Sequence, residues 1–179
     1  MKNLIEQLST YKSVHFNPVN LKTHFVGIPL IILSTAVFLS QFQWQITIFN
    51  IQWHFSLTHL LFLVVTLYYA WLKLVLACGM ILFIGLIIVL VDLLEVSAFA
   101  EIDWQIALGL FIVGWIFQFI GHRYEKAKPA FIDDLNQLFI GPLFLMAEIY
   151  FMLGWAPELE HKINQLAVTK RQQLSRLPK

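Results

Sequence analysis

The chain has 179 residues, of which 59% are hydrophobic and only 13% are charged, and its formal net charge is +1. Because soluble domains are typically about a quarter charged, this composition excludes an ordinary soluble domain and predicts an integral membrane protein. The small net charge gives no reason to expect a nucleic-acid partner, and the single cysteine, Cys78, excludes a disulfide or a cysteine-based zinc site within one chain.

We expect one integral membrane domain, residues 1–179, with an all-α fold. It is predicted to be a polytopic helical bundle with four spanning helices and a broken or re-entrant fifth apolar segment. Its expected parts are an N-terminal arm with a first histidine motif (1–24), four spans (25–121), a second histidine motif with the broken apolar segment (122–155), and a basic amphipathic tail (156–179). No cleavable signal peptide is expected, because Glu6 and Lys12 interrupt the N-terminus before any apolar core begins.

The first histidine motif lies at the start of the first apolar run. Asn17 followed by Pro18 is typical of a helix N-cap followed by the first helical residue. A helix that starts there places Asn20 and His24 four residues apart on one face. His15 precedes this helix and is free to turn back toward it.

Four apolar stretches are candidates to cross roughly 30 Å of hydrocarbon, which takes about 20 residues. They are Phe25–Phe42, Leu57–Leu72, Leu74–Val91 and Trp104–Gly121. Only the surroundings of Lys73 separate the second from the third, so these two should form an antiparallel helical hairpin. Between the first and the second, Trp44–His54 indicates a short extended or interfacial excursion, with Trp44 and Trp53 at headgroup level.

The fifth apolar stretch, Leu138–Trp155, differs from the other four. Gly141-Pro142 near its start and Glu148 inside it favour a broken, re-entrant or protein-buried segment. We expect Glu148 to lie near Arg123 or near the histidine site, or else to be a hydrogen-bonded structural acid. The tail that follows reads equally as an interfacial amphipathic helix or as a helix packed on its own domain.

The lysines and arginines predict the orientation of the chain. They are Lys2, Lys12, Lys22, Lys73, Arg123, Lys126, Lys128, Lys162, Lys170, Arg171, Arg176 and Lys179, whereas Asp92–Asp103 carries only acidic charges. Four crossings with a cytoplasmic N-terminus satisfy these loops, and the basic tail favours a fifth segment that dips in and returns. We expect the inner membrane of a bacterium, or the endoplasmic reticulum if the source is eukaryotic.

The second histidine motif follows the fourth span. Gln118, His122 and Glu125 recur at i, i+4 and i+7, one stripe of a helix. Four crossings, an even number, separate His24 from His122, so both motifs should lie on one face of the membrane, the cytoplasmic one by the charge pattern.

These residues predict a metal site. Imidazoles suit iron, zinc, copper or nickel, and a first shell of His15, His24 and His122 leaves coordination positions open. Asn20 and Gln118 would fix the ring tautomers or orient a ligand, and Glu125 would be a fourth ligand or a base. Asp133 and Asp134 are reserve carboxylates. His54 and His59 are not expected to be ligands, and His161 should be solvated.

The two motifs carry a family resemblance. "HFNPVNLKTHFVGIP" (His15–Pro29) together with "QFIGHRYEKAKPAFIDDLNQLFIGPLFLMAE" (Gln118–Glu148) resembles the Mpo1-like family over nearly the whole chain. The resemblance implies an Fe(II)-dependent dioxygenase of fatty acid α-oxidation, which uses O2 to shorten a 2-hydroxy fatty acid by one carbon. It implies His15, His24 and His122 as the histidine positions, with Asn20, Gln118 and Glu125 around them.

Two other functions fit the same residues. One is a non-catalytic membrane protein that binds haem or a metal ion, and the other is a zinc-dependent lipid hydrolase that activates a water molecule. Membrane lipid is an expected partner in every case, and the oligomeric state is left open.

Overall fold

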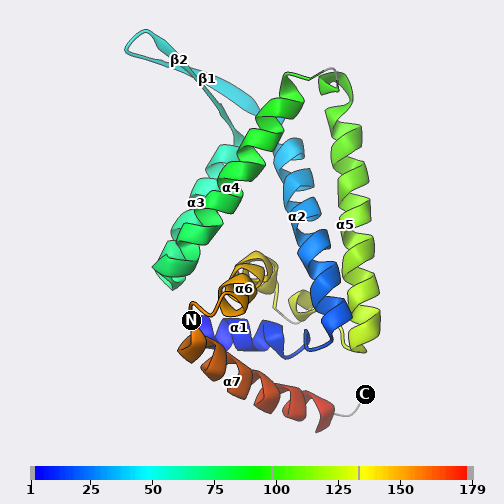
Figure 1. Cartoon of the computed structure of the whole chain (residues 1–179). Coiled ribbons are helices and arrows are strands. Elements are labelled where there is room, and N and C mark those ends of the chain that lie inside the picture. Colours follow the sequence, from blue (N-terminus) through cyan, green and yellow to red (C-terminus); the bar gives the residue numbers. More distant parts are fainter. Residues whose placement is uncertain (1–2, 98, 133, 177–179) are drawn as a thin grey trace. The chain divides into compact units, whose positions relative to one another are not determined.

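The computed structural model describes residues 3–97, 99–132 and 134–176. It is mostly helical. The helices are α1 (Leu4–Lys12), α2 (Pro18–Ser40), α3 (Leu57–Leu72), α4 (Leu74–Glu95), α5 (Asp103–Glu125), α6 (Gln137–Met152) and α7 (Pro157–Arg176), as drawn in Figure 1. Short 3-10 turns lie at Ala100–Ile102 and Ala130–Ile132. Lys2, Lys179 and Asp133, which the sequence singled out, lie outside the described residues.

The chain divides into two compact units. One, the histidine unit, contains residues up to 28 and from 116 onward; the other, the hairpin unit, contains residues 29–115. The division falls within α2 between Ile28 and Pro29, where the proline has no N–H to donate to the carbonyl of Phe25. It falls within α5 between Trp115 and Ile116.

Three helical stretches among the described residues are long and apolar enough to cross a membrane: Pro18–Ser40, Leu74–Glu95 and Ala100–Glu125. The expected span Leu57–Leu72 is a helix with those same bounds, but it has only 16 residues. At 1.5 Å per residue it is about 24 Å long, which is less than the roughly 30 Å of a hydrocarbon core. The fourth crossing therefore stays a prediction.

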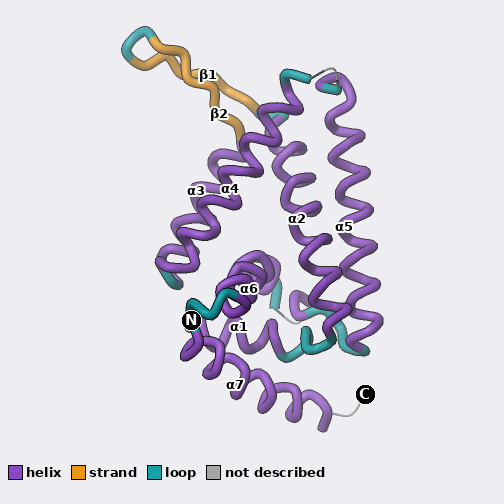
Figure 2. The backbone as a smooth tube through the Cα atoms, in the orientation of Figure 1, coloured by secondary structure: helices purple, strands orange, loops and turns teal. Residues whose placement is uncertain are grey.

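The hairpin unit contains the one sheet among the described residues, which the all-α expectation missed. β1 (Gln43–Ile48) pairs antiparallel with β2 (Ile51–Ser56), so the extended excursion expected in this connection is present (Figure 2). Phe49 and Asn50 form the turn with φ angles of 50° and 61°, the pattern of a type I′ turn. The left-handed conformation costs a residue with a side chain about 1–2 kcal/mol, so Phe49 is an unusual occupant.

The core of the hairpin unit is apolar, and two buried hydroxyls bond backbone carbonyls across it, those of Ser34 and Thr58. Ala36 and Val37 of α2 pack with Phe62, with three residues of α4 and with Ala107 of α5. The Ser34 hydroxyl donates to the Ala107 carbonyl at 2.7 Å, which ties α2 to α5. Buried hydroxyls satisfied in this way fit helices that associate within an apolar medium.

In the histidine unit, α6 is a continuous helix, so the break expected at Gly141-Pro142 is absent. Pro142 is the sixth residue of α6, and it removes only the hydrogen bond to the Leu138 carbonyl in the first turn. Residues along most of α6 are buried within the unit, as the protein-buried alternative required. α7 packs on α1, with Ile163 and Ala167 fully buried, so the tail lies on its own domain.

Candidate metal centre

Three histidine side chains converge inside the histidine unit. His15 lies in the loop between α1 and α2, His24 in the second turn of α2, and His122 in the last turn of α5. One ring nitrogen from each lies within 4.8 Å of the others, and all three side chains are buried. The ring centres are between 4.5 and 5.0 Å apart, and the rings meet edge to face. The imidazoles that the sequence placed on one face of a membrane therefore lie together.

Hydrogen bonds fix the tautomers of two rings. His15 Nδ1 lies 2.6 Å from the Tyr11 carbonyl oxygen, and His24 Nδ1 lies 2.8 Å from the Asn20 carbonyl oxygen. A carbonyl oxygen can only accept, so each Nδ1 carries the proton and each Nε2 carries a lone pair. The two Nε2 atoms lie 3.0 Å apart. Two lone pairs at this distance repel each other unless a cation lies between them.

A metal ion fits this arrangement better than a shared proton. Burial lowers the pKa of His15 well below its ordinary value of 6.5, and the neighbouring His24 lowers it further, so the ring is neutral at pH 7. Metal–nitrogen bonds of about 2.0–2.1 Å at octahedral or tetrahedral angles place two ligand nitrogens roughly 2.9–3.4 Å apart. The observed separation falls within this range.

A further buried atom points to a missing partner. Gln118 Nε2 has no hydrogen-bond partner in the described part of the chain, although it is shielded from solvent. Gln118 lies one turn before His122 on α5, as the sequence predicted, and its side chain is buried. Since unsatisfied buried polar atoms are rare in native structures, a bound ion with its ligands is the simplest occupant.

Aromatic rings shield one side of the triad. The Tyr11 ring stacks on His15 with centres 4.1 Å apart, and Phe144 of α6 lies 5.9 Å from His15. Gly141 makes room for this wall, because a Cβ there would lie 3.0 Å from the Tyr11 hydroxyl. Burial raises the pKa of the Tyr11 hydroxyl well above its usual value, so it stays neutral. The wall excludes water from the His15 side of the centre.

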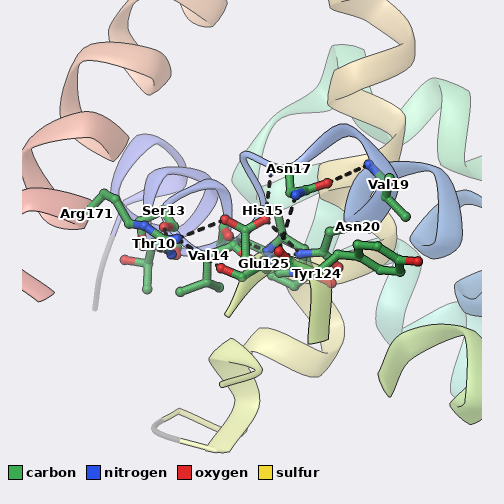
Figure 3. Close-up of polar contacts among 11 residues, drawn as sticks. Thr10, Ser13, Val14, His15, Asn17, Val19, Asn20, Tyr124, Glu125 and Arg171 are labelled. Carbon is green, nitrogen blue, oxygen red and sulfur yellow. Dashed lines mark hydrogen bonds and ion pairs between the residues drawn. The ribbon is translucent and has the colours of Figure 1, made fainter. Parts of the chain in front are cut away.

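Glu125 is buried, but its oxygens already have protein partners (Figure 3). Its Oε2 accepts from the Asn17 backbone N–H at 2.7 Å and from the Asn20 side-chain amide at 3.2 Å. Its Oε1 lies 3.2 Å from Arg171 Nη2. The carboxylate thus holds the N-terminus of α2 against the end of α5. It does not belong to the group of side chains that could hold a metal ion together, which is His15, His24 and His122.

Arg171 of α7 joins the segments that carry the histidines (Figure 3). Besides its ion pair with Glu125, it donates to the Ser13 and Glu125 carbonyls at 3.2 Å each. The Asn20 amide donates to the Val14 carbonyl at 3.0 Å. The loop before His15 is therefore held from both sides, by α7 and by α2.

The start of α2 forms as the sequence predicted. α2 begins at Pro18, and the Asn17 side chain accepts from the Val19 N–H at 2.8 Å. Asn20 serves His24 through its backbone carbonyl, as described above. A Cβ on Gly121 would lie 3.2 Å from the Asn20 Cα and would overlap the Asn20 and Thr23 side-chain oxygens. The two helices cross so closely because residue 121 has no side chain.

The other predicted carboxylates lie outside the triad. Glu148 forms an ion pair with Lys12, so the expected neighbour Arg123 is not its partner. Asp134 accepts from the Asn136 N–H at 3.1 Å and does not belong to the group of side chains that could hold a metal ion. Asp133 lies outside the described residues.

The remaining histidines are separate from the triad. His54 and His59 belong to the hairpin unit, where His59 Nδ1 lies 2.9 Å from the Ser56 hydroxyl. His161 is exposed on α7 and bonds Gln165, as expected for a solvated side chain.

Sequence reasoning missed two residues of this site. Tyr11 lies four residues before His15, and that spacing was a usable signal for a ring contact. Arg171 lies 46 residues after Glu125, and nothing local to it indicates the pairing.

Comparison with known proteins confirms the resemblance. Residues 1–153 match the model of the family described as 2-hydroxy-palmitic acid dioxygenase Mpo1-like. The chain belongs to the Mpo1-like family. It is 33% identical over 174 residues to the 2-hydroxy-palmitic acid dioxygenase MPO1 of Saccharomyces cerevisiae, and the match covers 96% of this chain and 94% of the yeast protein. No solved structure matches the chain. The triad, Tyr11 and Glu125 all lie within the part that matches the Mpo1-like family.

Proposed function

We propose that this member of the Mpo1-like family is an Fe(II)-dependent dioxygenase that converts a 2-hydroxy fatty acid and O2 to the fatty acid one carbon shorter. The observation that carries the proposal is the pair of facing Nε2 lone pairs of His15 and His24, 3.0 Å apart beside His122. The yeast relative is named a 2-hydroxy-palmitic acid dioxygenase, which supports the same substrate class.

The proposed reaction balances without another reductant. RCH(OH)COOH + O2 gives RCOOH + CO2 + H2O, so the substrate supplies all four electrons. No flavin, nicotinamide or 2-oxoglutarate is required. Iron bound at the triad would activate O2 and orient the hydroxy acid.

The residues of the site have separate roles in this proposal. His15, His24 and His122 hold the ion, and the Tyr11 and Asn20 carbonyls keep two of the rings in the ligating tautomer. Tyr11 and Phe144 exclude water. The Gln118 amide is placed to donate to a bound ligand. Glu125 positions the elements that carry the histidines.

Lys12 is the candidate partner of the substrate carboxylate. Its Nζ lies 5.7 Å from the Phe144 ring centre, and its charge acts on His15. We propose that the carboxylate competes with Glu148 for this cation, while the acyl chain lies among apolar helices.

The three-histidine donor set also suits zinc, so a zinc-dependent lipid hydrolase is the second candidate. A haem held by both His15 and His24 is disfavoured, because their Nε2 atoms lie 3.0 Å apart, which leaves no room for a porphyrin between them.

The test uses the purified full chain in detergent, loaded with Fe(II) without oxygen. On addition of 2-hydroxypalmitate and O2, we expect consumption of one O2 and release of one CO2 per pentadecanoate formed. Palmitate, which lacks the hydroxyl group, is the control and should give neither. No oxygen uptake with any 2-hydroxy fatty acid would refute the proposal, and zinc in the fresh protein with fatty acid release from an ester would favour the hydrolase.

The His122→Ala variant separates binding from folding. We expect it to lose bound iron and activity while its helical circular dichroism is retained, because the substitution removes one ligand from a buried site. Iron retained at full stoichiometry would remove His122 from the ligand set.

We further propose that the chain is embedded in a membrane with four crossings, a cytoplasmic N-terminus and the metal centre on the cytoplasmic face. The membrane would be a bacterial inner membrane, or the endoplasmic reticulum in a eukaryote. The three long apolar helices and the distribution of lysine and arginine support this placement.

A further inference from the structure

The β1–β2 hairpin is amphipathic across its two faces. The strand register pairs Trp44 with Phe55 and Ile46 with Trp53, and side chains paired in this way share a face. The alternate pairs are Gln43 with Ser56, Gln45 with His54 and Thr47 with Gln52, which form the opposite, polar face. We call the face of Trp44, Ile46, Trp53 and Phe55 the apolar face.

The apolar face is open. Trp44 is 42% exposed, Ile46 43% and Trp53 49%. The described part of the chain adds no third strand to this two-stranded sheet. An isolated two-stranded hairpin is only marginally stable in water. An exposed apolar face of this composition is therefore expected to be buried against another surface.

The tip of the hairpin also exposes a large apolar side chain. Phe49 is 95% exposed, although it holds a left-handed turn position that glycine or asparagine normally fills. At this exposure the Phe49 ring packs against almost nothing in the described part of the chain, so the cost of its conformation is not offset there by buried apolar area.

The base of the hairpin directs polar side chains toward the unit. The Gln43 amide donates to Glu95 of α4 at 3.1 Å. His54 and Ser56 line a cavity of about 270 Å³ with Asp92 and Glu95, and Phe55, at the base of the apolar face, also borders it. The polar face is exposed as well, at Gln43, Gln45, Thr47, Gln52 and His54, so the described part of the chain covers neither face of the hairpin along most of its length.

We propose that the β1–β2 hairpin is an interfacial anchor whose apolar face and tip lie on lipid at the membrane surface. This inference rests on the proposed membrane embedding. Tryptophan prefers the membrane interface, where its ring is buried and its N–H stays hydrated. Residues 43–56 contain no Lys, Arg, Asp or Glu, so no charged side chain of these types is desolvated there, and anionic lipid is not required. Leu57, the first residue of the apolar helix α3, directly follows the hairpin.

The test uses spin labels on the full chain, in a Cys78→Ala background, in phosphatidylcholine vesicles. Ile46→Cys places the label on the apolar face, and Thr47→Cys places it on the polar face one residue away. Leu82→Cys on α4, whose side chain is 78% exposed, is the membrane control. Collision with O2, which dissolves in lipid, is compared with collision with a water-soluble nickel complex.

We expect the ratio of O2 collisions to nickel collisions to be severalfold higher at positions 46 and 82 than at position 47. A high ratio at 82 with low ratios at both 46 and 47 overturns the anchor and leaves the membrane embedding intact. A low ratio at 82 overturns both. Spin–spin broadening at 46 that grows with the protein-to-lipid ratio means that a second copy covers the face, and it also overturns the anchor.

The tryptophans give a second measurement that needs no label. Replacing Trp44 and Trp53 with Phe keeps the apolar face, and it should remove fluorescence that lipid brominated near the headgroup quenches in the parent chain. Equal quenching of both chains would contradict the proposal.

Discussion

At the scale of single residues, the site depends on which nitrogen of each histidine carries a proton. The Tyr11 and Asn20 carbonyls lock His15 and His24 with Nε2 free. Second partners of this kind commonly contribute 10–100-fold to metal affinity. Glu125 and Arg171 act one step further out, since they hold the backbone that carries these partners.

The first prediction concerns Arg171. Replacing it with Gln breaks the ion pair with Glu125 and the bond to the Ser13 carbonyl, so the loop before His15 loosens. We expect metal affinity to fall about 10–100-fold, measured by competition with a chelating dye. The Arg171→Lys variant, which keeps the charge, should recover part of the loss.

Lys170→Gln is the matched control for Arg171. Lys170 lies next to Arg171 on α7, but its ammonium donates to the Thr10 hydroxyl and to the Glu6 carbonyl of α1. Equal metal affinities in the Arg171→Gln and Lys170→Gln variants would show that Arg171 has no positioning role.

The second prediction concerns the pH dependence of the metal-free chain. Burial lowers the pKa of His15 below the value of about 6.5 expected in the unfolded chain. Below pH 6.5 the unfolded state therefore binds more protons than the folded state. As the pH falls, His15 lowers the free energy of unfolding by up to about 1.4 kcal/mol per pH unit, until the pKa of His15 in the folded chain is reached. Above pH 6.5 this contribution to the pH dependence disappears.

The measurement is thermal unfolding of the metal-free protein in detergent between pH 5 and 8, compared with His15→Asn. The variant should lose less stability at low pH than the parent chain. Parallel curves for the two proteins would mean that His15 does not carry this dependence.

At the scale of elements, the crossing of α2 and α5 sets the distance between His24 and His122. Gly121 lies at this crossing, and Gly109 lies on the same helix with nothing within 4 Å of its Cβ position. The two glycines therefore form a natural pair of probes, one inside a close contact and one outside it.

The third prediction is that Gly121→Ala destabilises the protein by about 1–3 kcal/mol and weakens metal binding, because the helices must separate. Gly109→Ala should be neutral or stabilise by up to about 1 kcal/mol, since alanine favours a helix. Unfolding and metal titration of both variants check this. Equal behaviour of the two would contradict the close crossing.

The sequence predicted the elements whose signals are local. The Asn17-Pro18 pair marked the start of α2, and the spacing of Gln118, His122 and Glu125 placed them on one helix. The partners of Glu125 could not be predicted, because Arg171 approaches it through the packing of α7. The continuity of α6 was missed, because a proline near a helix start removes little hydrogen bonding.

At the scale of the whole molecule, hydropathy predicted where α3 lies but not whether it crosses a membrane. α3 has the expected bounds but is short for a crossing. Helices of this length can still cross where the bilayer thins or where flanking residues extend toward the interface. The position of Lys73, between α3 and α4, decides whether α3 crosses. If α3 crosses, Lys73 lies on the cytoplasmic side, and if α3 does not cross, Lys73 lies on the same side as the β1–β2 hairpin.

The fourth prediction is that His54 and Lys73 lie on opposite sides of the membrane. We expect a membrane-impermeant maleimide, added to sealed vesicles of one orientation, to label either His54→Cys or Lys73→Cys, in a Cys78→Ala background, and to label the other only after the vesicles are opened. α3, with 16 residues, separates the two positions. If both cysteines are labelled from the same side, then α3 returns to the surface where it began, and the chain has three crossings. Histidines on the two sides of an odd number of crossings could not share an ion, so that outcome would also remove the basis of the metal centre.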